Sequence, residues 1–174
     1  MLIVMCGLPG AGKSAVAQAL ARALRAPVLS VDPIEAAVWR AGVEREQPTG
    51  VAAYAVAQAT AAENLRLGLT VIVDAVNDAP EARSAWIDLA REQVVPLRFI
   101  EVLCSDPEVH QRRLLQRRRD LPGFPEPTWE SVQERRAAFA DWQQERLVLD
   151  SLRPLPELTA HALAHLSVDA AGPG

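Results

Sequence analysis

Lysine is almost absent from this sequence. Lys13 is the one lysine among 18 Lys and Arg residues, so arginine supplies nearly all of the positive charge. The two side chains are not interchangeable, because the guanidinium is broad and planar whereas the ammonium is a compact point charge. The stretch that keeps the lysine, GLPGAGKS at residues 7–14, is therefore the first place to look for chemistry.

Cysteines are few and apolar runs are short. Cys6 and Cys104 lie far apart, with no CxxC pattern or Cys/His cluster, which excludes a zinc site or a disulfide framework. Both are expected to be buried core residues in a reducing compartment. The apolar run at the amino terminus ends at Gly7, too early for a signal peptide or a membrane span of about 18 residues. We expect a cytoplasmic protein with no membrane partner.

Positive charge is also in short supply. The net charge of −4 at pH 7 excludes a broad basic surface for nucleic acid, although not one local basic cleft. A length of 174 residues suits one domain with one sizeable core. We expect a single domain over residues 1–168, followed by a frayed tail at 169–174.

Short apolar segments alternate with longer helical patterns, which predicts an α/β fold with a mainly parallel sheet. The expected strands are Leu2–Cys6, Val28–Val31, Thr70–Val73, Leu97–Cys104 and Leu147–Leu149. The expected helices are Lys13–Leu24, Ala52–Leu67 ended by Gly68, Ala79–Glu92, one that a Ser105/Glu108 capping box opens, Glu130–Arg146 and Leu155–Leu166. The proline-rich stretch 120–128 is expected to be a loop.

The stretch at residues 7–14 fits the pattern G-x-x-x-x-G-K-S, with a predicted strand before it and a predicted helix after it. Such a loop turns its backbone N–H groups inward around phosphate oxygens. The lysine reaches the β and γ phosphates, and the serine hydroxyl binds Mg²⁺. The pattern predicts ATP and Mg²⁺ as cofactors. The expected nucleotide-binding residues are Gly7, Leu8, Pro9, Gly10, Ala11, Gly12, Lys13, Ser14 and Ala15.

Two carboxylates follow predicted strands. Asp32, in LSVDPIE, is either a general base that accepts the proton of a hydroxyl group or a helix N-cap. Asp74, in VIVDAVN, is either an Mg²⁺ ligand or a turn residue. Asn77 and Arg83 are expected to face the same cleft.

An arginine-rich stretch, HQRRLLQRRRD, contains Arg112, Arg113, Arg117, Arg118 and Arg119. A mobile arginine stabilises the charge that spreads over a phosphoryl group during transfer. We expect a lid around residues 108–128, with Arg117 and then Arg113 as the arginines that contact phosphate. The alternative is a solvated basic helix face.

Taken in order, the loop lysine, the aspartate after the second strand and the arginine-rich stretch resemble the P-loop kinases. This group includes shikimate and gluconate kinases, chloramphenicol phosphotransferase, zeta-type toxins and the phage polynucleotide 5′-kinase domain. The resemblance is strongest to the last of these, in which GxPGSGKS, SxD and VIxDATN followed by an arginine recur; here they read GLPGAGKS, SVD and VIVDAVN with Arg83. It covers about residues 1–150.

The resemblance implies the nucleotide-kinase type of P-loop NTPase fold, with five parallel strands ordered 2-3-1-4-5 and helices on both faces. It also implies Asp32 as the base, lid arginines near Arg117 on the phosphates, and Asp150 beside the adenine. One departure concerns the acceptor. Phage-type polynucleotide kinases carry an arginine three positions after the base, where this sequence has Glu35.

These observations favour an ATP-dependent kinase that phosphorylates a hydroxyl group of a small molecule. Nucleic acid is a less favoured partner, because Glu35 would repel a phosphate. The alternatives are a polynucleotide or RNA 5′-hydroxyl kinase, and an ATP-binding regulatory or toxin module without metabolite turnover. Trp39, Tyr54 and Trp129 either line the acceptor pocket or belong to the core. The oligomeric state stays open.

Overall fold

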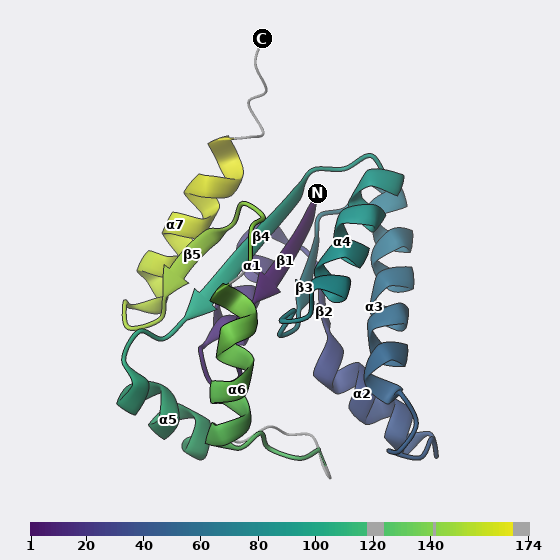
Figure 1. Ribbon diagram of the computed structural model, residues 1–174. Coiled ribbons are helices and arrows are strands. Elements are labelled where there is room, and N and C mark those ends of the chain that lie inside the picture. Colours follow the sequence, from purple (N-terminus) through teal and green to yellow (C-terminus); the bar gives the residue numbers. More distant parts are fainter. Residues whose placement is uncertain (118–123, 141, 169–174) are drawn as a thin grey trace.

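A five-stranded parallel sheet lies at the centre of the molecule (Figure 1). The computed structural model describes residues 1–117, 124–140 and 142–168. The strands are β1 (Leu2–Cys6), β2 (Val28–Ser30), β3 (Val71–Asp74), β4 (Leu97–Leu103) and β5 (Leu147–Asp150). Their order, β2-β3-β1-β4-β5, confirms the predicted fold.

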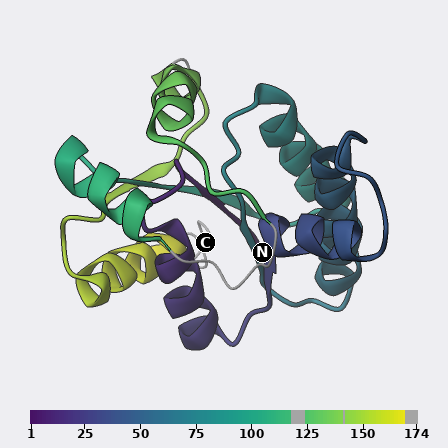
Figure 2. The same cartoon turned by 90° about the horizontal axis from the view of Figure 1, so that it is seen from below.

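Helices cover both faces of the sheet (Figure 2). They are α1 (Lys13–Leu24), α2 (Val31–Arg40), α3 (Thr49–Arg66), α4 (Pro80–Glu92), α5 (Pro107–Gln116), α6 (Trp129–Ala140) and α7 (Leu155–Val168). Because side chains alternate along β1, Ile3 and Met5 pack with α1 and α7, whereas Leu2 and Val4 pack with α3, α4 and α6. The core therefore has two layers, one on each face of the sheet.

Helix α2 is an element that the sequence analysis missed. The strand expected over Val28–Val31 ends at Ser30, and Val31 begins a ten-residue helix. Pro33 falls in the first helical turn, where its missing N–H group breaks no hydrogen bond. Asp32 therefore lies on the first turn of a helix and not at the end of a strand.

The capping box predicted for Ser105 and Glu108 is wrong. The N-cap of α5 is Asp106, whose carboxylate accepts hydrogen bonds from the backbone N–H groups of Glu108 at 2.9 Å and Val109 at 3.1 Å. The Ser105 hydroxyl donates to Asp150 instead. Pro107 fixes this register, because proline favours the first helical position and the cap is then the residue before it.

Several other expectations can be compared with the described residues. Gly68 ends α3 with a φ of 79°, and Cys6 and Cys104 are free and buried, as expected. Helix α6 ends at Ala140 instead of Arg146.

The expected lid at 108–128 includes residues 118–123, which lie outside the described residues. The tail at 169–174 lies outside them as well. Within the described ranges, no helix is long and apolar enough to cross a membrane.

Asn77 and Arg83 are structural residues, so their predicted place in a cleft is wrong. Asn77 is fully buried with a φ of 55°; its amide donates to the Met5 carbonyl at 2.8 Å and accepts from the Trp86 indole N–H at 2.9 Å. The buried Arg83 donates to the backbone carbonyls of Asn77 at 3.1 Å and Asp78 at 2.6 Å. Together they fix the turn from β3 to α4 against β1.

Trp86→Phe is expected to lower the free energy of unfolding by about 1–3 kcal/mol, because the buried Asn77 side-chain oxygen loses its indole donor. Urea denaturation measures the change. Leu67→Ala is the control, since Leu67 is 76% exposed and its truncation is expected to cost less than about 0.5 kcal/mol. Equal stability of Trp86→Phe and wild type would contradict this account of the turn.

Candidate active site

The loop between β1 and α1 depends on glycine at three positions. Gly7, Gly10 and Gly12 have φ values of 135°, 81° and 96°, which side chains rarely tolerate. Space is limited as well, because a Cβ atom on Gly7 would lie 2.2 Å from the Val102 carbonyl oxygen of β4. Gly12 is the N-cap of α1, so the free N–H groups of that helix face the loop. The loop therefore forms an anion-binding concavity.

The first cavity, of about 200 Å³, lies at this loop and at the amino end of α1. Its lining combines small residues, one lysine and two arginines: Gly10, Gly12, Lys13, Ser14, Ala15, Arg113 and Arg117. Backbone donors, an ammonium and guanidinium groups together suit a ligand with several anionic oxygens. The other predicted loop residues lie around it: Pro9 lines a second cavity, and Leu8 and Ala11 line a third on the β4 side of the loop.

Lys13 and Asp74 form a buried ion pair beside the first cavity. Lys13 Nζ lies 3.7 Å from Asp74 Oδ1, and both side chains are less than a tenth exposed. Asp74 Oδ1 has no hydrogen-bond donor within the described residues, which is costly for a buried carboxylate oxygen. A carboxylate oxygen together with the Ser14 hydroxyl fits Mg²⁺, which binds few protein oxygens and keeps waters and phosphate oxygens.

The second cavity, of about 260 Å³, adjoins the first at Arg117. It is lined by Pro9, Asp32, Glu35, Val76, Arg117, Phe124, Pro125, Glu126, Pro127, Ser131 and Arg135. Arg117 follows the last residue of α5 and lines both cavities, with its Nη2 atom 3.8 Å from Asp32 Oδ2. The structure thus brings together Asp32, the predicted base, and Arg117, the arginine expected first to contact phosphate, at the junction of the two cavities.

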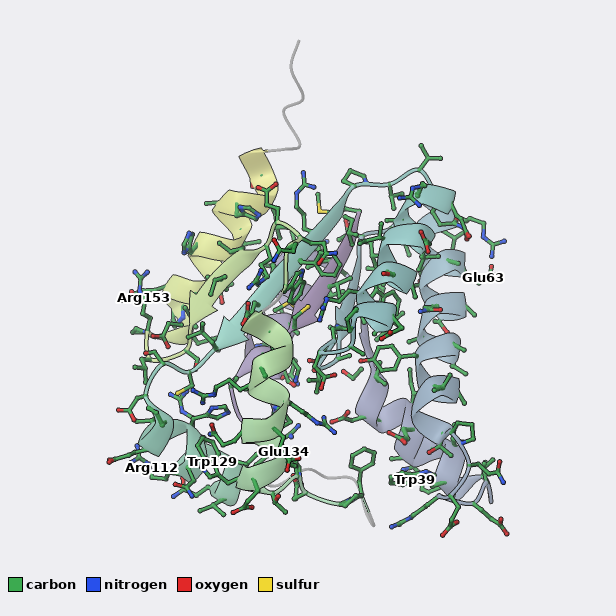
Figure 3. The ribbon with its side chains drawn as sticks, in the orientation of Figure 1. Trp39, Glu63, Arg112, Trp129, Glu134 and Arg153 are labelled. Carbon is green, nitrogen blue, oxygen red and sulfur yellow. The ribbon has the colours of Figure 1, made fainter. Side chains whose placement is uncertain are left out.

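The three aromatic residues considered for the acceptor pocket differ in their surroundings. Trp39 stacks on Phe124, which lines the second cavity, with ring centroids 4.8 Å apart. Trp129, at the start of α6 beside α5 (Figure 3), packs against His110, and Tyr54 packs against the buried Trp86. Trp39 is thus in aromatic contact with the lining of the second cavity.

Arg113 fastens α5 to the turn after β5. Its guanidinium donates to the Ser151 hydroxyl at 2.7 Å and to the Ser151 carbonyl at 3.1 Å, and it also lines the first cavity. Ser151 packs against the loop, since a Cβ atom on Gly12 would lie 3.3 Å from the Ser151 Cβ. Ser151 was not predicted as a site residue, although it follows β5, a strand whose carboxyl end lies at the same edge of the sheet as the loop.

His110 is a second residue that the sequence analysis missed. Its side chain is buried, and Nε2 donates to the Pro9 carbonyl of the loop at 2.8 Å. Burial lowers the pKa of His110, and the nearby charges of Arg136 and Arg113 lower it further, although the bond to Pro9 opposes this. The one sequence signal that points to His110 is its spacing of three residues from Arg113, which puts both side chains on one face of the helix. Helix α5 is therefore held to the loop by neutral His110 and to β5 by Arg113.

Comparisons with known proteins agree with the fold. A family model described as an AAA domain matches residues 2–140, and the chain belongs to this family. Kti12 of Chaetomium thermophilum in complex with ADP-AlF3 superposes with a TM-score of 0.73 at 21% identity, covering 99% of this chain and 100% of that one.

Two structures of kinases are similar at comparable identity. A gluconokinase of Sinorhizobium meliloti gives a TM-score of 0.64 at 21% identity, over 95% of this chain and 90% of its own. The APS kinase of Mycobacterium tuberculosis, in complex with AMPPNP and APS, gives 0.68 at 17% identity, over 95% and 96%. The fold is therefore that of the P-loop kinases.

Gly7→Ala is expected to lower the melting temperature and to weaken binding of MgADP at least about tenfold, because the new Cβ atom collides with β4 and displaces the loop. Gly42→Ala is the matched control: Gly42 also has a positive φ, of 94°, but a Cβ atom there has no neighbour within 4 Å. Calorimetry measures both effects. Unchanged nucleotide affinity in Gly7→Ala would contradict the proposed role of the close contact.

Acid is expected to destabilise the protein partly through His110. Because its pKa is lowered in the folded state, the unfolded chain takes up a proton at a higher pH than the folded protein does. The free energy of unfolding should therefore fall as the pH drops below about 6.5.

His110→Gln, whose amide N–H is able to replace the donor to Pro9, should show a weaker fall between pH 7.5 and 5.5 in urea titrations. His161→Gln, at an exposed histidine of α7, should keep the wild-type dependence on pH. A wild-type dependence in His110→Gln would contradict the assignment of the effect to His110.

Proposed function

We propose that this AAA domain protein is a kinase that transfers the γ-phosphoryl group of Mg·ATP to a hydroxyl group of a small molecule. One observation carries the proposal: Arg117 lines both the loop cavity and the second cavity, and stands 3.8 Å from Asp32. A donor in one cavity and an acceptor in the other would meet at this arginine.

The first cavity is proposed to hold the phosphates of ATP. The N–H groups of the loop and of the first turn of α1 would bind phosphate oxygens, and Lys13 would reach the transferred group. Ser14 and Asp74 would hold Mg²⁺, either directly or through water. When bound, the ion neutralises the phosphate charge that develops during transfer.

Asp32 is proposed as the general base. It would accept the proton of the acceptor hydroxyl while the oxygen forms a bond to the γ-phosphorus. The bond between that phosphorus and the β–γ bridging oxygen breaks, and its electron pair leaves with ADP. Arg117 would move from its pairing with Asp32 onto the phosphoryl oxygens, and Arg113 would keep α5 in place through Ser151.

Two of the similar structures, a gluconokinase and an APS kinase in complex with AMPPNP and APS, support a kinase with a small-molecule acceptor. Kti12 in complex with ADP-AlF3 supports nucleotide binding and does not discriminate between a kinase and an ATP-binding module. A polynucleotide acceptor is disfavoured, because Glu35 lines the second cavity and would lie close to an acceptor phosphate. The single domain over residues 1–168, the lid at 108–128 and the cytoplasmic location remain predictions.

Asp32→Asn is expected to lower kcat for phosphoryl transfer by about 10²–10⁴-fold, since it removes the proton acceptor. Affinity for MgADP should change less than about twofold, because Asp32 lies in the second cavity. Transfer from γ-labelled ATP and calorimetry are the measurements, with Lys13→Ala as the blank.

Asp88→Asn, at an exposed carboxylate of α4 that pairs with Arg91, is the matched control and should keep wild-type transfer. An Asp32→Asn variant with wild-type kcat would sink the assignment of the base.

A further inference from the structure

Glu35 lines the second cavity with its carboxylate held in place by a chain of hydrogen bonds. The indole N–H of Trp39 donates to Thr49 Oγ1 at 2.8 Å, and the Thr49 hydroxyl donates to Glu35 Oε1 at 2.8 Å. Thr49 is only 3% exposed, so this chain is sheltered from water. Because Thr49 Oγ1 accepts the hydrogen bond from Trp39, the hydroxyl hydrogen of Thr49 is available for a second hydrogen bond, and Glu35 accepts it.

No arginine in the described part of the chain forms an ion pair with Glu35. The two arginines that line the cavity among the described residues have carboxylate partners: Arg117 lies 3.8 Å from Asp32, and Arg135 lies 3.7 Å from Asp78. Within the described residues, Glu35 belongs to no ion pair. A partly buried carboxylate of this kind favours a cationic ligand and disfavours an anionic one.

An aromatic ring stands in the same cavity. Phe124 contributes to the lining and stacks on Trp39 with an angle of 26° between the rings. The guanidinium of Arg45 already lies 4.6 Å from the centre of the Trp39 ring, so this aromatic pair attracts one cation of the protein itself. Ammonium groups bind in the same way at an aromatic face beside a carboxylate.

We infer that the phosphoryl acceptor is an amino alcohol, a hydroxyl compound whose protonated amine binds between Glu35 and Phe124. The inference rests on the proposed function, since Asp32 has to accept the proton from the hydroxyl group of the same molecule. Asp32 and Glu35 are three residues apart on α2, which places side chains about 5–6 Å from each other. The amine and the reacting hydroxyl are therefore separated by a few bonds only.

The test uses γ-labelled ATP and a metabolite extract of the source organism, separated by ion exchange at pH 7 into cationic, neutral and anionic fractions. Each fraction serves as the acceptor in a separate reaction, and transfer of label is expected in the reaction with the cationic fraction. Treatment of that fraction with acetic anhydride, which converts amines into neutral amides, is expected to abolish its acceptor activity.

Glu35→Gln provides the test from the side of the protein. Its amide oxygen still accepts from Thr49, so the helix keeps its hydrogen bond while the charge is lost. The KM for the cationic acceptor is expected to rise about tenfold, with kcat and MgADP affinity close to wild type. Glu63→Gln is the control and should behave as wild type. Glu63 is exposed and lies on α3, near the end of that helix that is distant from Trp39 (Figure 3).

The outcomes separate this inference from the proposed function. Label in the neutral or anionic fraction would overturn the amino-alcohol inference and leave the kinase proposal standing. Acceptor activity that survives acetylation, or an unchanged KM in Glu35→Gln, would also overturn the inference. Label in none of the fractions, with MgADP still bound, would overturn the proposed function and the inference with it.

Discussion

The central position of β1 is the constraint on which the site depends. Parallel pairing with β3 on one side and β4 on the other brings the carboxyl ends of all three strands to one edge, with Met5 opposite Asp74. This register places Asp74 beside the loop and within 3.7 Å of Lys13. A buried ion pair contributes little to stability because both charges lose their hydration. The pair is therefore better explained by a ligand that uses both charges than by folding.

Helix α5 and the residue after it connect the parts of the site. His110 binds the loop through the Pro9 carbonyl, Arg113 binds the turn after β5 through Ser151, and Arg117 reaches Asp32 of α2. One short segment thus contacts the phosphate-binding loop, the edge of the sheet and the proposed acceptor helix. A change in the position of α5 would alter both cavities at once, which suits a reaction that needs donor and acceptor held together.

The strands and the glycine loop were predictable because they depend on short-range patterns: apolar runs, glycine spacing and one lysine. The order of the strands came from the resemblance to the P-loop kinases, because no short-range pattern fixes it. The sequence could not reveal α2, because Asp32 and Pro33 fit both a strand end and a first helical turn. Asn77 and Arg83 were misplaced for a related reason. Polar side chains after a strand suit a cleft or a buried backbone contact, and only the packing of Trp86 against Asn77 decides between them. His110 and Ser151 become functional candidates only through contacts between distant segments.

In the proposed reaction, a phosphoryl group passes from the loop cavity to a hydroxyl group in the cavity of Asp32. Phosphorus NMR of the wild-type protein with Mg·ATP and the whole, unfractionated metabolite extract follows this transfer directly. A new phosphate monoester signal is expected to grow in equal amount with ADP. Growth of inorganic phosphate alone, or no turnover of bound ATP, would contradict it.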